Sequence, residues 1–119
     1  MTNEQRAEKL ITELGFDFEK IEKNYIIRLI EEEIDNYQDG SSEYIRLLCG
    51  YLYCIGDESD AVLLEKAKYS ISFDVGCMID GEWIDSLANR SVNYPILSRK
   101  ELIQGFVDYY KGYKADEFD

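Results

Sequence analysis

The sequence predicts an all-α fold, and three observations lead to this prediction. The chain contains a single proline in 119 residues, and proline interrupts helices more strongly than any other residue. Apolar residues recur at helical spacing along most of the chain. Forty-five per cent of the residues are apolar, which is enough to form one core. We therefore expect residues 1–119 to form a single-domain antiparallel bundle of about six helices, with a frayed tail over residues 115–119.

Capping signals and periodicity predict the first two helices. Thr2 and Gln5 form a capping box at the start of the first helix, and Gly15 ends it. The second helix is expected over residues 18–37. The predicted apolar faces consist of Ala7, Leu10, Ile11 and Leu14 in the first helix and of Ile27, Ile30, Ile34 and Tyr37 in the second. The acidic residues of the second helix are expected to face water, with a role in binding as the alternative: Glu31, Glu32, Glu33 and Asp35.

The third helix is predicted over residues 41–55, with one of its first two serines as the N-cap. Almost all of its residues are apolar or aromatic, so we expect this helix to be buried on all sides. Gly56 ends it. The acidic segment 57–60 then supplies capping oxygens and negative charge to the start of a fourth helix that extends to about Tyr69.

A fifth helix is predicted from Asp74, as its cap, to about Leu87. Gly76 and Gly81 weaken this helix, so a break near Gly81 and a division into two helices stay open. Its expected buried residues are Val75, Met78, Ile79, Trp83 and Leu87.

The last helix is predicted to follow an irregular stretch over residues 89–97, in which Pro95 forces Tyr94 towards an extended conformation. A second capping box, formed by Ser98 and Glu101, begins this helix. Its apolar face consists of Ile103, Phe106, Val107 and Tyr110.

The charge of the chain excludes some classes of partner and favours others. There are 25 acidic and 13 basic residues, which gives a net charge of −12 and a pI near 4.4. Such a charge repels nucleic acid and anionic lipid and attracts basic surfaces. We therefore expect no nucleic-acid partner and no membrane partner. The excess of carboxylates belongs to residues 1–90.

Several further features favour a cytoplasmic protein. No export signal is visible near the start, and the longest apolar stretch, residues 47–55, is about half the length that spans a bilayer. The cysteines Cys49, Cys54 and Cys77 are expected to be reduced core residues. The sequence leaves the oligomeric state open, with a monomer favoured.

Catalysis is not expected. The chain contains no histidine, which removes the commonest general base and a common metal ligand. The glycines do not match the spacing of a phosphate-binding loop, and segment 57–60 lacks the ligand spacing of a calcium loop. A pair of carboxylates, as in glycosidases, is the remaining enzymatic alternative, but it requires a cleft that a short helical chain rarely provides. We therefore expect no cofactor and no metal.

The segment Asp80 to Asp85 is the strongest candidate for binding, because three carboxylates surround the only tryptophan. In one interpretation Trp83 is a core residue with solvated acidic neighbours. In the other, the acids form an exposed ridge that pairs with basic residues of a partner, and Trp83 adds an aromatic contact. The predicted partner-binding residues are Asp57, Glu58, Asp60, Asp80, Glu82, Trp83 and Asp85.

Two resemblances extend this interpretation. Residues 44–68, with the turn Ile55-Gly56-Asp57, resemble one HEAT-like helical hairpin, whose short turn lets its helices pack antiparallel. The whole chain, including residues 73–87, resembles the small acidic helical immunity proteins of bacterial polymorphic toxin systems. This resemblance implies a cytosolic inhibitor of a cognate toxin, such as a nuclease with a basic groove. The alternative is a helical adaptor or regulatory module without an inhibitory role.

Overall fold

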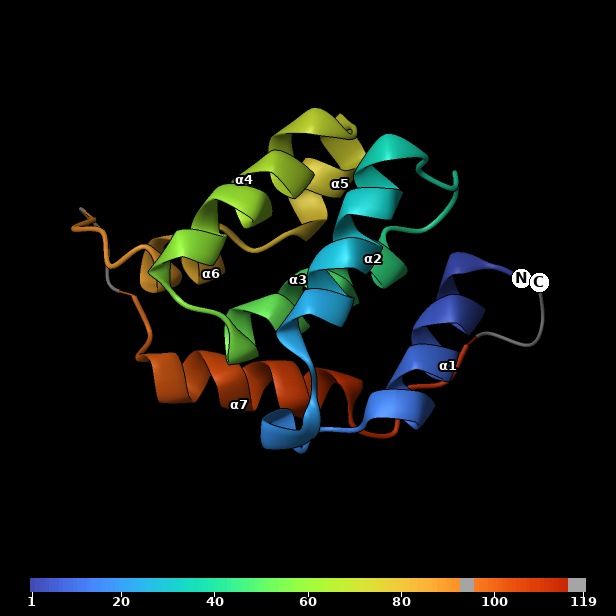
Figure 1. Cartoon of the computed structure of the whole chain (residues 1–119), viewed down its shortest axis with the longest axis horizontal. Helices are drawn as coiled ribbons and strands as arrows, with labels where there is room; N and C mark the ends of the chain where they lie inside the picture. The colour runs from blue at the N-terminus through green and yellow to red at the C-terminus, as the bar shows by residue number, and fades with distance from the viewer. Residues whose placement is uncertain (93–95, 116–119) are drawn as a thin grey trace.

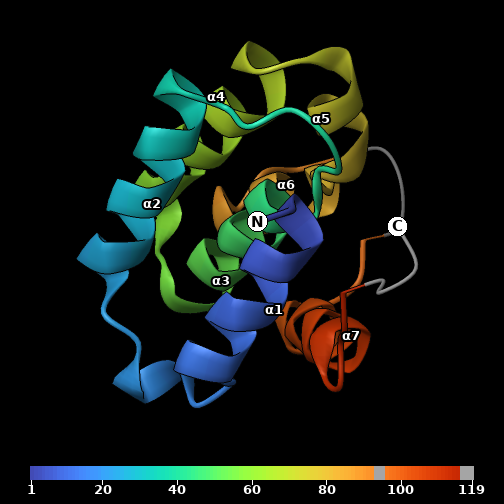
Figure 2. The same ribbon diagram turned by 90° about the vertical axis from the view of Figure 1, so that its right-hand side faces the viewer.

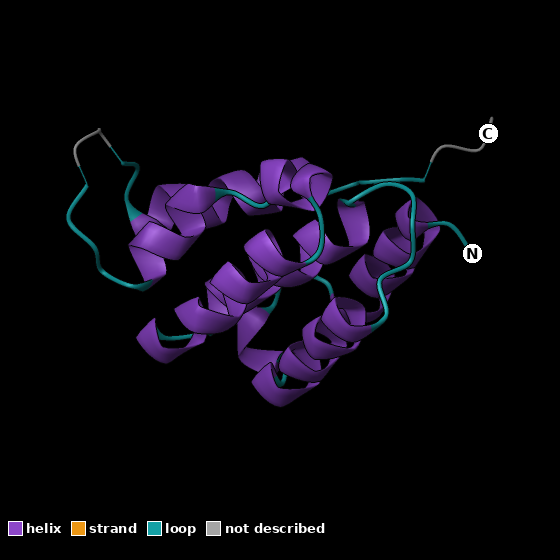
Figure 3. Cartoon of the chain, turned by 90° about the horizontal axis from the view of Figure 1, so that it is seen from above, coloured by secondary structure: helices purple, strands orange, loops and turns teal. Residues whose placement is uncertain are grey.

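The computed structural model describes residues 1–92 and 96–115, and within these ranges every regular element is helical (Figures 1 and 3). The all-α prediction is confirmed, with seven α-helices in the described residues where about six helices were expected. The elements are α1 (Asn3–Leu14), η1 (Phe18–Lys20), α2 (Lys23–Asp35), α3 (Glu43–Ile55), η2 (Glu58–Asp60), α4 (Ala61–Ser70), α5 (Phe73–Met78), α6 (Gly81–Leu87) and α7 (Arg99–Tyr110), where η denotes a short 3-10 helix.

Helix α3 lies at the centre, and the other helices surround it (Figures 1 and 2). Ten of its thirteen residues are buried, which confirms the prediction that it is covered on all sides. Arg46 is its half-buried cation. The guanidinium carbon lies 4.6 Å from the ring centre of Tyr109 and 5.0 Å from that of Trp83, so aromatic faces accommodate its charge.

Local capping signals placed several helix ends correctly. The Thr2–Gln5 capping box is present, with the Gln5 N–H donating to Thr2 Oγ1 at 3.1 Å. The Ser98–Glu101 box begins α7 in the same way. Gly15 ends α1 with a positive φ of 62°, a conformation that glycine adopts without strain. These ends depend on residues three or four apart, so sequence alone could locate them.

The connection between α3 and α4 forms the predicted helical hairpin (Figure 1). The Gly56 N–H donates to the Leu52 carbonyl at 2.7 Å and closes α3. Asp57 then caps η2 by accepting from the Ser59 N–H at 3.0 Å. The helix α4 itself begins four residues later than Asp57, at Ala61.

The second helix is shorter than predicted. Residues 18–20 form a separate 3-10 turn, and the extended backbone at Ile21 (φ −95°, ψ 123°) ends that turn and places the Ile21 side chain in the core. Helix α2 ends at Asp35, so Tyr37 lies beyond it. Its buried face is rotated by about one residue from the predicted stripe and consists of Ile26, Ile30 and Glu33.

The predicted fifth helix is divided into α5 and α6, with the break just before Gly81. Ser72, and not Asp74, caps α5, because its hydroxyl accepts from the Val75 N–H at 3.2 Å. The prediction that Met78 is buried is wrong, since its exposed fraction is 42%. The extended backbone at Ile79 turns that side chain into the core at 1% exposure and leaves Met78 outside.

The predictions for Tyr94, Pro95 and most of the tail lie outside the described residues. In α7, the predicted apolar face is confirmed for Phe106 and Tyr110, which are buried. Ile103 and Val107 are half-buried against the same core.

The cysteines differ in their exposure. All three are free thiols, but Cys49 is buried, Cys54 is half-buried and Cys77 is exposed, so the prediction of a core position is wrong for Cys77. Burial raises the pKa of the Cys49 thiol from 9.0 to about 12. It also raises the pKa of Cys54 to about 12, although Arg99 opposes the shift.

Because burial raises the pKa of these thiols, we expect the protein to lose stability at alkaline pH. The unfolded chain releases the Cys49 proton near pH 9, whereas the folded chain holds it to about pH 12, so the stabilisation is complete below pH 9 and declines as the pH rises towards 12. One thiol changes the free energy of unfolding by at most about 1.4 kcal/mol per pH unit. Urea unfolding under reducing conditions measures this slope. The slope should be smaller in Cys49→Ala, and an unchanged slope in that variant would contradict the assignment.

Candidate functional site

Trp83 is a core residue, which corrects its assignment to the partner-binding surface. Its exposed fraction is 2%. The indole stacks on Tyr53 with ring centres 6.2 Å apart, and it meets the Phe106 ring edge-on at 6.0 Å. Because other side chains cover both the ring and its edges, Trp83 cannot contact a partner while the chain is folded.

Asp60 is not part of the predicted partner-binding surface either, because its exposed fraction is only 8%. Its Oδ2 accepts from the Asp57 N–H at 2.8 Å and from Lys23 Nζ at 3.0 Å. These bonds fix the turn between α3 and α4 and attach it to the start of α2. Asp57 is exposed, and hydrogen bonds from Ser59 lower the pKa of its carboxyl group. Glu58 is exposed as well.

The acids around α6 have mainly local roles. Asp80 is the N-cap of α6 and accepts from the Glu82 N–H at 3.0 Å. Asp85 forms an ion pair with Arg90, 3.6 Å between Oδ1 and Nη1. The Glu82 residue is half-buried. Of the three carboxylates in the predicted exposed ridge, capping uses Asp80 and ion pairing uses Asp85, so only the half-buried Glu82 has neither role.

An exposed aromatic patch was not predicted as a site. We define this aromatic patch as Tyr69, Phe73 and Cys77, three exposed residues that line one hollow of about 340 Å³. Phe73 has an exposed fraction of 84%, and Tyr69 has 75%. Contiguous exposed apolar groups mark interaction sites on folded proteins.

The sequence carried a signal for this patch. Helix α4 buries Ala61, Leu64 and Ala67, yet it also has apolar side chains on the opposite face, where Val62 and Tyr69 are separated by seven residues. Two apolar faces on one helix imply that only one can be buried against its own chain.

The C-terminal end of α2 is a second unusual surface. Its last five residues, 31–35, include four acids, and no basic residue lies in the last turn. Glu33 is buried at 5% exposure, which corrects the prediction that it faces water. The acids border an open hollow of about 680 Å³, hereafter the α2 hollow, lined by Arg6, Glu32, Glu33, Asp35, Asn36, Tyr37 and Gln38.

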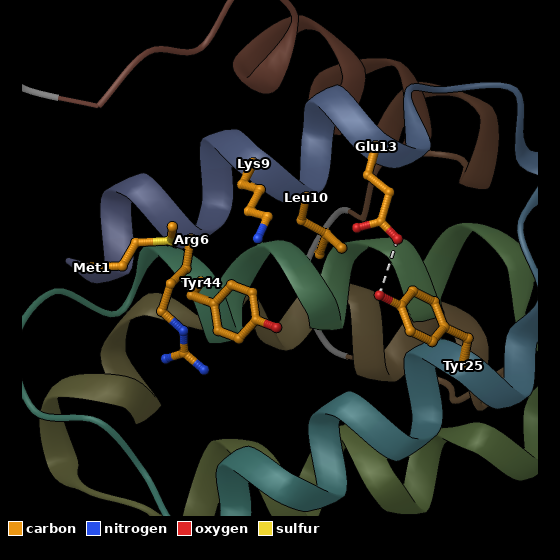
Figure 4. Close-up of a pocket in the computed structure, with 7 residues that line it drawn as sticks. All are labelled: Met1, Arg6, Lys9, Leu10, Glu13, Tyr25 and Tyr44. Carbon is orange, nitrogen blue, oxygen red and sulfur yellow. Dashed lines mark hydrogen bonds between the residues drawn. The ribbon is translucent and has the colours of Figure 1, made fainter.

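A smaller groove of about 250 Å³, also lined by Arg6, lies beside α1 (Figure 4). The Arg6 guanidinium carbon lies 3.9 Å from the ring centre of Tyr44. Tyr25 donates its hydroxyl hydrogen bond to Glu13 at 3.1 Å and so joins α2 to α1. Arg6 lines both this groove and the α2 hollow, and the interactions in the groove hold α1 against its neighbours.

The aromatic patch and the α2 hollow lie on neighbouring helices. Figures 1 and 2 show the C-terminal ends of α2 and α4 side by side, with α5 next to them. The contacts between α2 and α4 agree with this arrangement. The helices that carry the apolar surface and the carboxylate-rich surface are thus neighbours.

No family model, curated protein or solved structure matches the chain. In residues 1–92 and 96–115, no group of three or more histidine, cysteine or acidic side chains is arranged to hold a metal ion. Over the same part of the chain, the helices are too short or too polar to cross a membrane.

Proposed function

We propose that this chain is an immunity protein that binds and neutralises a bacterial toxin with a basic surface. The observation that supports the proposal is the aromatic patch, in which Tyr69 and Phe73 are 75% and 84% exposed. Exposed apolar area is unfavourable in water at roughly 25 cal/mol per Å², so covering this patch would stabilise a complex. Tyrosine and other large aromatic side chains commonly contribute most to such contacts.

The charge supports a basic partner. A net charge of −12 raises the rate at which a positively charged protein is encountered, and it discourages association with other acidic proteins. A toxin that acts on nucleic acid needs a basic groove, and an acidic protein would be drawn to that groove. The aromatic patch would then supply the affinity that persists at high salt, where screening weakens the charge attraction.

Truncation of the aromatic patch tests the site. In Tyr69→Ala and Phe73→Ala we expect the toxin affinity to fall at least about 30-fold for each variant, because each removes a central aromatic contact. Calorimetric titration with a catalytically inactive toxin measures the affinity. Leu97→Ala is the control, since Leu97 is an exposed apolar residue outside the patch, at 51% exposure. Patch variants that bind the toxin as tightly as the Leu97→Ala variant would place the interface elsewhere.

Co-expression tests the function itself. The toxin candidates are secreted proteins with variable C-terminal domains that are encoded next to this gene. Growth of cells that carry both proteins, together with a complex of the two, would support neutralisation. A complex without rescue of growth would favour the adaptor alternative. If no candidate is bound or neutralised, the inhibitor proposal fails.

A further inference from the structure

The end of α2 carries an excess of negative charge. The C-terminus of a helix has the equivalent of about half a negative charge, so acidic residues there destabilise the helix. Helix α2 nevertheless places four acids in residues 31–35. Of the residues that line the α2 hollow, Arg6 is the only basic one, and its guanidinium is bound to Glu33. A cation from outside the chain would find this position favourable.

Glu33 supplies a second, independent observation. Its Oε1 accepts a hydrogen bond from Arg6 Nη2, whereas its buried Oε2 has no hydrogen-bond partner. Buried polar atoms without a partner are rare, because the hydrogen bonds lost from water are not replaced. Glu33 lines the α2 hollow. A donor that enters the hollow could supply the missing bond after a small movement of the surrounding side chains.

The chemistry of the hollow selects among cations. Glu32, Asp35, Asn36 and Gln38 line it, and each of these side chains carries an acceptor oxygen. The carboxylates are not grouped as metal ligands in the described residues. A guanidinium group matches this lining best, since it offers five N–H donors in one plane, pairs with carboxylates in a two-pronged manner and stacks on rings such as that of Tyr37.

We propose that the α2 hollow binds an arginine side chain of the partner protein. This inference rests on the proposed function, because it names the residue of the basic partner that contacts this end of the molecule. The aromatic patch covers apolar surface of the partner, while the α2 hollow fixes the orientation of the complex through the arginine.

A peptide titration tests the hollow without the toxin. Acetyl-Gly-Arg-Gly-amide is added to the full chain and followed by backbone amide NMR. We expect saturable shifts at residues 32–38, weaker shifts with the lysine peptide, and none with the citrulline peptide, which has the same shape without the charge. Absence of saturable shifts at residues 32–38, or equal shifts with citrulline, would overturn the inference.

Charge-matched variants distinguish a site from general attraction. Glu32→Gln with Asp35→Asn removes two charges at the hollow, and we expect the arginine peptide to bind at least about fivefold more weakly. The control, Glu19→Gln with Asp108→Asn, removes two exposed charges from η1 and α7 and should leave binding unchanged. Circular dichroism checks that both double variants are folded. Equal weakening in the two double variants would contradict a specific site.

The toxin separates this inference from the proposed function. Neutralisation that survives Glu32→Gln with Asp35→Asn but is lost in Tyr69→Ala and Phe73→Ala would reject the arginine site and support the inhibitor. Specific binding of the arginine peptide by a chain that neutralises no neighbouring toxin would reject the inhibitor and support the arginine site.

Discussion

Replacing Trp83 with alanine should lower the free energy of unfolding by about 3–5 kcal/mol. The indole is 2% exposed and contacts Tyr53 and Phe106, so its removal leaves a large cavity between α3, α6 and α7. Because Trp83 is the only tryptophan, the variant loses its indole fluorescence, and unfolding in urea is better followed by circular dichroism. Trp83→Phe retains part of the apolar volume and should lose less stability.

Phe73→Ala is the matched comparison for Trp83→Ala. Phe73 is 84% exposed, so we expect its truncation to change stability by no more than about 0.5 kcal/mol. The two substitutions should thus affect different properties. Trp83→Ala lowers stability, whereas Phe73→Ala lowers the affinity for the toxin. A Trp83→Ala protein as stable as the wild type would contradict the packing of α6 against α3.

Gly50→Ala should also be strongly destabilising, although alanine normally favours a helix. A Cβ at Gly50 would lie 2.2 Å from Phe106 Cε1 and 3.1 Å from the Trp83 ring. Phe106 is 2% exposed and lies among other aromatic rings, so it cannot turn away without disturbing them. We expect a loss of about 2–3 kcal/mol from overpacking, which exceeds the gain of about 1 kcal/mol in helix propensity.

Gly105→Ala is the control for this substitution. Gly105 also lies inside a helix, α7, but apart from its chain neighbours and the backbone of its own helix, no described atom would be within 4 Å of its Cβ. Its replacement should therefore stabilise the protein by up to about 1 kcal/mol. Chemical unfolding of both variants measures the difference in their stability.

In Gly50→Ala with Phe106→Leu, the combined loss of stability should be smaller than the sum of the losses in the two single variants, because leucine leaves room for the added methyl group. Equal effects of Gly50→Ala and Gly105→Ala would show that α7 does not press against α3.

Sequence alone predicted the parts of the structure that depend on near neighbours along the chain. The capping boxes at Thr2 and Ser98 link residues three apart, and Gly15 and Gly56 end helices through bonds within one turn. The burial of α3 also followed from its composition, since a helix that is apolar on every side has no face suited to water.

The candidate site depended on the tertiary structure. Periodicity indicates which residues share a face of a helix, but it does not say which neighbour covers that face. Glu33 resembles its acidic neighbours in sequence, yet it is buried and bound to Arg6, which α1 brings to it from 27 positions away.

Trp83 and Phe73 also show that sequence alone does not tell which side chains are covered. Both are large aromatic residues beside acids in the sequence, yet packing of α6 against α3 and α4 buries Trp83, whereas the cap at Ser72 starts α5 with Phe73 left in solvent. The sequence by itself therefore determined the all-helical character of the chain, the helix ends set by local capping signals, and the acidic charge. Only the packing of distant segments decided which aromatic and acidic side chains remain available to a partner, because exposure is a property of the assembled surface.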